Sequence, residues 1–346
     1  MSSRYLIIVL PLAVPWAFSS GAVIAQPKSA RLQPAHFHHL HLNSLNPPAA
    51  IEYYARAFAT VTEARLAGFD GFTTTSRMSS EGGNVVVLIS KADTPPLIKP
   101  QSAVSHFGWN VPNSRAYLEK FHVLKLRVVP MYADPDGTLV ENSSEALPGY
   151  LTKGQIADAR SKGTKPVQRG GFHYLQGPDG ALIESYGDFP AERFTHIHMY
   201  HRDPVCAQQW YARHLGATVA ATYLHLGPGA PSGPSGRGGA SDECRRSPAE
   251  PSYPAFEREG RIREPSGYVL FDDIGLPIWP YDGPLVTTRG QTVDHIGLSV
   301  TGLAATLARL RTEGVQITEE PYQWGTSRAA MIEGPDHVAL ELIERN

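Results

Sequence analysis

The chain has 346 residues, which at the usual ~150 residues per domain is enough for two domains with hydrophobic cores. Hydrophobic residues make up 42% and charged residues 18%, a composition that is typical of a soluble globular protein and excludes a largely disordered or polytopic membrane protein. The net charge of -2 provides no basic surface for nucleic acid or an anionic membrane, and two cysteines exclude a disulfide-built scaffold or a cysteine-rich zinc module.

The first 25 residues have the pattern of a signal peptide. A short basic leader ends at Arg4, residues 5–18 form an apolar run interrupted by Pro11 and Pro15, and small residues lead to Ala25. We therefore predict cleavage after residue 25 and a secreted or periplasmic protein with no membrane attachment after cleavage. The alternative is an uncleaved N-terminal anchor, although the apolar run is too short for a good membrane span.

Four segments of the chain repeat one pattern, in which a histidine opens a short alternating strand and a helix N-cap residue follows seven positions later. The opening histidines are His39, His106, His196 and His295, and the corresponding cap positions are Asn46, Asn113, Asp203 and Gly302. Each repeat continues with an amphipathic helix and about three strands. The sequence therefore predicts an α+β fold of four βαβββ units.

Pairing of consecutive units predicts two domains, one over residues 31–190 from units one and two and one over 191–346 from units three and four. Residues 227–265 are rich in Gly, Pro, Ser and Arg and are predicted to be a flexible insert in unit three. Cys206 falls in the third predicted helix and Cys244 in the insert. The sequence leaves open whether they form a disulfide.

The opening strands alternate between apolar and polar residues. In the first, His39 and His41 share one face and Leu40 the other; in the third, His196 and His198 share one face. Because the apolar faces must pack on the helices, the opposite face of the sheet is lined by histidines and small polar groups. Such a surface suits a concave ligand-binding cup.

The last strands of units two and four each contain one glutamate among aliphatic residues, Glu184 and Glu341, shortly after a Pro-Asp turn. A lone buried carboxylate is costly unless it is paired or bound to a metal. If units pair one with two and three with four, each pair offers two histidines and one glutamate. The two predicted sets are His39, His106 and Glu184, and His196, His295 and Glu341.

Two imidazoles and one carboxylate on one face of an octahedral ion suit Fe2+, and the same ligands can hold Mn2+, Ni2+ or Zn2+. Three positions stay open, two for a substrate with adjacent oxygens and one for water or dioxygen. We therefore predict a divalent metal ion, with Fe2+ favoured. The alternative is that the six side chains are polar strand residues without a metal.

The sequence resembles the vicinal oxygen chelate superfamily, which includes glyoxalases, bleomycin- and fosfomycin-resistance proteins and extradiol dioxygenases. The resemblance rests on the segments HHLHLNSLNP, SHFGWNVPNS, THIHMYHRDP and VDHIGLSVTGL and on the closings GPDGALIE and GPDHVALELIE, and it covers residues 31–346. It implies two domains, each a cupped mixed sheet of eight strands with helices on the outside. It also implies metal ligands from first and last strands, in the same two sets of three.

The extradiol dioxygenases carry the closing pattern Tyr-x-x-Asp-Pro-x-Gly-x-x-x-Glu. The segment from Tyr174 to Glu184 matches it except for Gly177, whereas unit four has Met331 in the tyrosine place. Tyr174 is a candidate hydrogen-bond donor to a substrate oxygen or a half-buried strand aromatic. His41 and His198 are candidate acid/base or supporting groups, or polar lining of the cup.

The resemblance and the candidate ligands together predict a metal-dependent enzyme that acts on a small molecule with adjacent oxygens, as a monomer or homo-oligomer and with no nucleic-acid partner. The four-unit layout favours an extradiol-type dioxygenase. A glyoxalase-like isomerase or lyase, with Glu184 or Glu341 also acting as base, is the first alternative. The second is a small-molecule binding or resistance protein without catalysis.

Overall fold

The computed structural model describes most of the chain after the predicted signal peptide. The described residues are 33–76, 84–133, 139–143, 161–163, 171–187, 189–219, 256–258, 261–263 and 267–345. The predicted signal peptide over 1–25 and almost all of the predicted insert over 227–265 lie outside these ranges. Within the described ranges, the structure has no helix of the length and apolarity that a membrane crossing requires.

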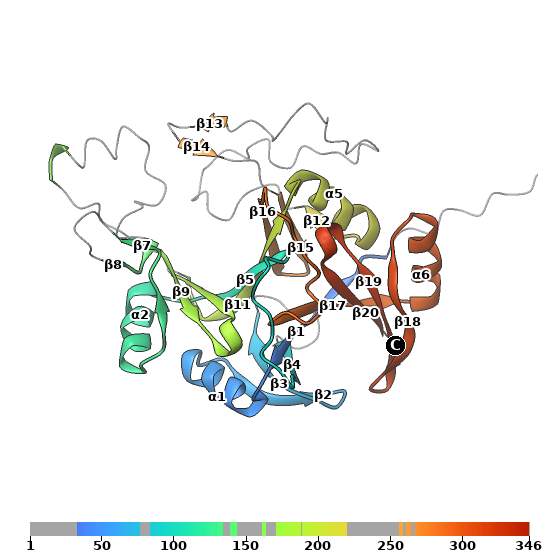
Figure 1. Ribbon diagram of the computed structural model, residues 1–346, viewed down its shortest axis with the longest axis horizontal. Coiled ribbons are helices and arrows are strands. Elements are labelled where there is room, and N and C mark those ends of the chain that lie inside the picture. The colour runs from blue at the N-terminus through green and yellow to red at the C-terminus, as the bar shows by residue number, and fades with distance from the viewer. Residues whose placement is uncertain are drawn as a thin grey trace, which may run out of the picture. The chain divides into compact units, whose positions relative to one another are not determined.

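One eight-stranded mixed sheet combines the first and the fourth predicted units, in the order β18-β19-β20-β17-β1-β4-β3-β2 (Figure 1). Its central strands β1 and β17 are antiparallel, and each is parallel to the last strand of its own unit. The strands are β1 (His36–Ser44), β2 (Thr62–Leu66), β3 (Phe69–Thr75), β4 (Asn84–Lys91), β17 (Val293–Thr301), β18 (Ile317–Trp324), β19 (Ser327–Glu333) and β20 (Ala339–Arg345).

A second eight-stranded sheet combines the second and third units, in the order β12-β15-β16-β11-β5-β10-β9-β6. Its central strands β5 and β11 are again antiparallel. The strands are β5 (Val104–Asn110), β6 (Val128–Val129), β9 (Phe172–Gln176), β10 (Leu182–Tyr186), β11 (Arg193–His201), β12 (Thr218–Val219), β15 (Gly267–Phe271) and β16 (Ile274–Pro280). Two hairpins stand apart, β7 (Tyr132–Ala133) with β8 (Leu139–Val140) and β13 (Phe256–Arg258) with β14 (Arg261–Arg263).

Within the described residues, a helix follows the opening strand of each unit, as predicted. The helices are α1 (Pro47–Ala57), α2 (Ser114–Val123), α5 (Pro204–Leu215) and α6 (Leu303–Thr312). The side chains of Asn46, Asn113 and Asp203 each accept a hydrogen bond from a backbone N–H in the first turn, which satisfies a donor that the helix leaves free. The α+β class and the four repeated units are therefore confirmed.

The predicted pairing of unit one with unit two and of unit three with unit four is wrong. The sheets join unit one with unit four and unit two with unit three, so neither sheet follows the predicted division into 31–190 and 191–346. Units one and two, and units three and four, meet instead at the C-terminal ends of their helices. Lys120 of α2 donates to the carbonyl of Ala57 in α1 at 2.8 Å, and Arg309 of α6 donates to that of His214 in α5 at 2.8 Å. The four opening strands have similar patterns, so their sequences alone do not determine which two pair.

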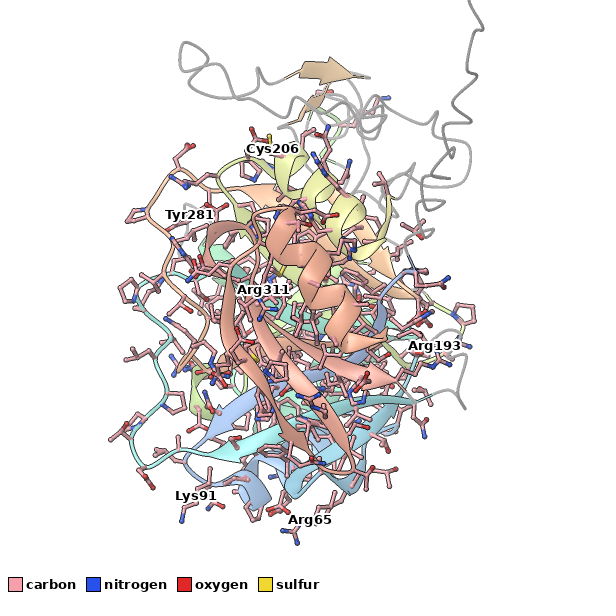
Figure 2. All side chains as sticks on the ribbon, turned by 90° about the vertical axis from the view of Figure 1, so that its right-hand side faces the viewer. Arg65, Lys91, Arg193, Cys206, Tyr281 and Arg311 are labelled. Carbon is pink, nitrogen blue, oxygen red and sulfur yellow. The ribbon has the colours of Figure 1, made fainter. Side chains whose placement is uncertain are left out.

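The apolar faces of the opening strands lie in the hydrophobic core, as the alternation predicts. Leu40 and Ile296 are fully buried, and α6 packs against β17 and β20 (Figure 2). The core is continuous between the two sheets. Trp109 of β5 stacks on Phe58 at 4.0 Å between ring centroids, and its indole N–H donates to the hydroxyl of Thr74 in β3 at 3.1 Å.

The two Pro-Asp turns connect each sheet to the opening strand of the other. The turns form short 3-10 helices, η1 (Pro178–Gly180) and η2 (Pro335–His337). The carboxylate of Asp336 accepts from Nδ1 of His201 at 3.1 Å and from the backbone and side chain of Arg202 at 3.0 and 2.8 Å, at the end of β11. The carboxylate of Asp179 accepts the backbone N–H of Leu45 at 3.2 Å, after β1, and its backbone carbonyl accepts from the hydroxyl of Thr292 at 2.7 Å. The two turns are therefore hydrogen-bonded to the residues that follow β1 and to the end of β11.

Cys206 lies on α5 (Figure 2) and is disulfide-bonded. Cys244, the only other cysteine of the sequence, lies outside the described residues.

Candidate metal centres

Side chains from both units of each sheet converge on one point of its polar face. In the first sheet, which contains β1 and β17, these are His39 of β1, His295 of β17 and Glu341 of β20, hereafter site A. Nε2 of His39 lies 3.4 Å and Nε2 of His295 lies 3.6 Å from Oε2 of Glu341. All three side chains are buried.

The second sheet, which contains β5 and β11, has an equivalent cluster formed by His106 of β5, His196 of β11 and Glu184 of β10, hereafter site B. Nε2 of His106 lies 3.1 Å from Oε2 of Glu184, and Nε2 of His196 lies 3.6 Å from its Oε1. Ligand-type atoms of these three residues lie within 4.8 Å of one another.

All six predicted ligand residues therefore come together, but in different sets from those predicted. The sets His39, His106 and Glu184, and His196, His295 and Glu341, are wrong because they assumed that unit one shares a sheet with unit two, and unit three with unit four. Each cluster instead takes one histidine from the opening strand of each paired unit, and its glutamate from the last strand of unit two or four.

A glycine makes room for one histidine in each cluster. The sequence His-x-Gly occurs in both β17 and β5, and the glycine faces the opening histidine of the neighbouring strand. A Cβ atom on Gly297 would overlap the imidazole of His39, and one on Gly108 would lie 2.7 Å from Cε1 of His196. Glycine is therefore required for the rings to lie where they do.

The outer nitrogen of His295 is held by a carboxylate. Nδ1 of His295 bonds to Asp294 at 2.6 Å, and the same Asp294 accepts from Arg289 at 2.6 Å, from the backbone of Gly290 at 2.8 Å and from Asn43 at 2.9 Å. A carboxylate behind a histidine fixes its tautomer and directs the other nitrogen toward a ligand position. The sequence analysis missed Asp294, although the Asp-His dipeptide is a local signal for this arrangement.

Each glutamate also accepts a hydrogen bond from a tyrosine hydroxyl. Tyr174 of β9 donates to Glu184 and Tyr322 of β18 donates to Glu341. Tyr174 is the strand partner of Glu184, and Met331, which has the tyrosine place in the closing pattern of unit four, is the strand partner of Glu341. In site A, Met331 has no hydroxyl, and the hydroxyl that donates to Glu341 belongs to Tyr322 on β18. Tyr322 lies in a polar edge strand, and no sequence pattern indicated that it contacts Glu341.

Burial and neighbouring charges determine the protonation of these groups. Burial, followed by the proximity of His295, holds the pKa of His39 well below its ordinary value. Burial raises the pKa of Glu184, but the hydrogen bond from His106 and the charge of His196 outweigh this and lower it. Burial lowers the pKa of His295, whereas its hydrogen bond to Asp294 and the nearby carboxylate of Glu341 raise it overall. A neutral imidazole at His39 and an ionised carboxylate at Glu184 are the forms that bind metals.

The donor atoms of site A fit a divalent metal ion. Nε2 of His39, Nε2 of His295 and Oε2 of Glu341 are buried, face one another and have no hydrogen-bond partner among the described residues. Buried polar atoms without partners are rare because each costs about 1–3 kcal/mol. A cation bound by two imidazole nitrogens and a carboxylate oxygen satisfies all three atoms.

His41 and His198 lie beside the clusters, as the alternation predicted. The ring of His41 stacks on His295 with centroids 4.4 Å apart, and that of His198 stacks on His106 at 4.7 Å. His198 also stacks on Trp279 at 5.6 Å. Each cluster therefore has a third imidazole packed against one of its histidines.

Comparisons with known proteins agree with this arrangement. Residues 193–342 match the model of the Glyoxalase/Bleomycin resistance protein/Dioxygenase superfamily. Glyoxalase I from Zea mays has a similar structure, with a TM-score of 0.55 and 12% identity over 90% of this chain and 92% of that chain. A putative dioxygenase from Bacillus subtilis subsp. subtilis str. 168 has a TM-score of 0.51 and 10% identity over 90% of this chain and 86% of that chain. Comparison with curated proteins gives no match.

These findings define the class of protein. Residues 193–342 match the model of the Glyoxalase/Bleomycin resistance protein/Dioxygenase superfamily, and the described chain has a paired fold like that of glyoxalase I. The resemblance drawn from the sequence is thus confirmed.

Proposed function

We propose that the protein is a metal-dependent enzyme whose substrate is a small molecule with two adjacent oxygens. The observation that carries this proposal is the convergence of two histidines and one glutamate in each of two clusters, with buried unpartnered donor atoms in site A. Imidazole and carboxylate together suit Fe2+, and also Mn2+, Ni2+ or Zn2+. Fe2+ is the favoured ion.

Site B provides the side chains for chemistry on such a substrate. His106, His196 and Glu184 would hold the metal, which when bound supplies Lewis acidity to the coordinated oxygens. The hydroxyl of Tyr174 fixes the carboxylate of Glu184 through its hydrogen bond. The imidazole of His198, packed against His106, is placed to exchange a proton with a substrate oxygen.

The reaction we favour is extradiol-type ring cleavage, because two histidines and one carboxylate with open positions are the ligand set of many Fe2+ oxygenases. The test is oxygen uptake with a series of catechols after anaerobic loading with Fe2+. We expect uptake by the wild type and its loss in a His106→Ala, His295→Ala double variant, which removes one ligand from each site. Uptake that persists in this variant would show that neither cluster is the active site.

A glyoxalase-type isomerisation is the second candidate. The observation that favours it is the position of Glu341, whose Oε1 accepts the Tyr322 hydroxyl while Oε2 faces the site without a hydrogen-bond partner among the described residues. Such an oxygen is available to accept a proton from a carbon next to a carbonyl group. Turnover of a 2-hydroxycarbonyl compound without oxygen would identify this reaction. Protein purified without chelators that contains no stoichiometric metal would contradict both enzyme proposals and favour a binding protein.

We also propose that the protein is exported. Support comes only from the leader pattern of residues 1–25. N-terminal sequencing of the mature protein from the periplasm or medium should begin after Ala25. An intact Met1 in protein recovered from the cytoplasm would contradict export.

A further inference from the structure

A third histidine faces the interior of site A. His41 lies two residues after His39 on the same face of β1 and is the strand partner of His295 across the β1–β17 pair. Its side chain is only 4% exposed. Nε2 of His41 bonds to the hydroxyl of Ser90 at 2.7 Å, whereas Nδ1 is buried without a hydrogen-bond partner among the described residues.

In every donor residue of site A, as in His41, one polar atom is hydrogen-bonded and the other has no hydrogen-bond partner among the described residues. Each side chain has its outer polar atom fixed by a hydrogen bond: Nδ1 of His39 by His38 at 2.9 Å, Nε2 of His41 by Ser90, Nδ1 of His295 by Asp294, and Oε1 of Glu341 by Tyr322. Each also has its inner atom buried and unpartnered among the described residues: Nε2 of His39, Nδ1 of His41, Nε2 of His295 and Oε2 of Glu341.

The donor residues of site A lie close together. Ligand-type nitrogens of His39, His41 and His295 lie within 4.8 Å of one another, and Oε2 of Glu341 lies 3.4 Å from His39 and 3.6 Å from His295. Four preoriented donors with nothing to bond to are costly in a buried site unless a cation occupies it. Side chains that bind metals in proteins usually have a hydrogen bond to the atom that faces away from the metal, which orients the ligand atom.

Site B differs from site A in the hydrogen bonds of its ligand atoms and in the surroundings of its third histidine. Nε2 of His106 already donates to Glu184 at 3.1 Å, and the outer nitrogens of His106 and His196 bond to the hydroxyls of Ser105 and Thr195 at 3.1 Å each. Among the described residues, the group at site B that could hold a metal is His106, Glu184 and His196, which does not include His198, whereas the group at site A is His39, His41 and His295. His198, the equivalent of His41, stacks on a half-exposed tryptophan at the edge of the cup.

We propose that His41 is the fourth protein ligand of the metal in site A, which is then bound by three imidazoles and one carboxylate. This inference rests on the proposed function, since both require a divalent ion at the cluster. Four protein ligands leave two positions of an octahedral ion, enough for a substrate with two adjacent oxygens, whereas three ligands at site B leave a third position for another reactant. The two sites therefore differ in affinity and in chemistry, and oxygen-dependent chemistry belongs to site B.

The test uses Cu2+ as the probe and counts coordinated nitrogens by electron paramagnetic resonance. Site A is studied in a His106→Ala, His196→Ala background and site B in a His39→Ala, His295→Ala background. We expect hyperfine coupling from three nitrogens at site A and two at site B. Adding His41→Ala to the site A background should reduce the count to two and weaken Zn2+ binding at least about 100-fold in a chelator competition, because loss of a supporting residue alone costs 10–100-fold.

The matched control is His198→Ala in the site B background, which should retain two nitrogens and its Zn2+ affinity within about threefold, since no ligand is lost. Two nitrogens at site A, or an unchanged affinity after His41→Ala, would overturn the inference while leaving the proposed function intact. Absence of metal from both backgrounds and from the wild type would instead overturn the proposed function.

A folding defect is recognised separately. In the otherwise wild-type chain, a correctly folded His41→Ala variant still binds one metal at site B. If that metal is also lost, Ser90→Ala makes the same test, because it keeps the His41 ring and removes only the hydrogen bond that orients it. We expect about 10-fold weaker Zn2+ binding at site A in this variant, and an unchanged affinity would overturn the inference.

Discussion

Replacing Gly297 by alanine tests whether site A depends on the position of the His39 ring. The added Cβ would lie 2.9 Å from Cγ of His39 and closer still to two other ring atoms, whereas ordinary contact begins at 3.4 Å. The ring must therefore move by at least about 0.5 Å, and metal–ligand distances tolerate only about 0.2 Å. We expect the metal affinity of site A to fall at least about 100-fold, and the free energy of unfolding of the metal-free protein to fall by about 1–3 kcal/mol.

The assay is metal content after dialysis, combined with thermal unfolding of the metal-free protein. The matched variant is Gly108→Ala, whose Cβ would lie 2.7 Å from Cε1 of His196 and 2.6 Å from the carbonyl oxygen of Glu184. Each variant should lose the metal of its own site and retain the other. If Gly297→Ala binds two metals with wild-type affinity, the position of the His39 ring does not determine metal binding and this reasoning is refuted.

Three further predictions concern the supporting contacts. Tyr322→Phe should weaken metal binding at site A by about 10–100-fold and leave site B unchanged, whereas Tyr174→Phe should do the reverse, as measured by chelator competition. Asp336→Ala should lower the free energy of unfolding in urea by about 2–4 kcal/mol, because it removes three hydrogen bonds; Asp179→Ala removes one and should cost about 1 kcal/mol. His173 is buried and its pKa is lowered by burial to about 4, so its contribution to stability is present above pH 6.5 and is lost as the pH falls toward 4. His173→Leu should reduce the loss of stability between pH 7.5 and 4.5 by about 2–3 kcal/mol. The first prediction is contradicted if the two tyrosine variants weaken metal binding at site A equally. The second is contradicted if the two aspartate variants lower the free energy of unfolding equally, and the third if His173→Leu leaves the pH dependence of stability unchanged.

The local structure of each unit could be predicted because it depends on neighbours in sequence. Alternation in β1 separates His39 from Leu40 by strand geometry alone, and Asn46 followed by Pro47 defines the start of α1. The six candidate ligand residues could be recognised for the same reason: a histidine at the start of a strand, and a glutamate in an apolar strand, are local patterns.

The grouping of these residues depends on which opening strands pair, and this is a tertiary property. All four opening strands have one apolar face and one edge suitable for pairing, so hydrophobic periodicity does not distinguish the possible partners. The informative feature is the fit between His39 and Gly297 and between His196 and Gly108, which becomes evident only when the strands are side by side. Tyr322 was missed because it reaches Glu341 from a neighbouring strand rather than from the closing pattern.

The most direct test of the account is the metal content of two double variants. The central claim is that His39 and His295 bind one metal, and His106 and His196 another. We predict that the wild type binds two metals, that His39→Ala, His295→Ala retains one with unchanged affinity, and that His39→Ala, His106→Ala binds both at least about 100-fold more weakly. The opposite pattern, with one metal retained only when His39 and His106 are removed together, would contradict the pairing of units one and four on which both sites depend.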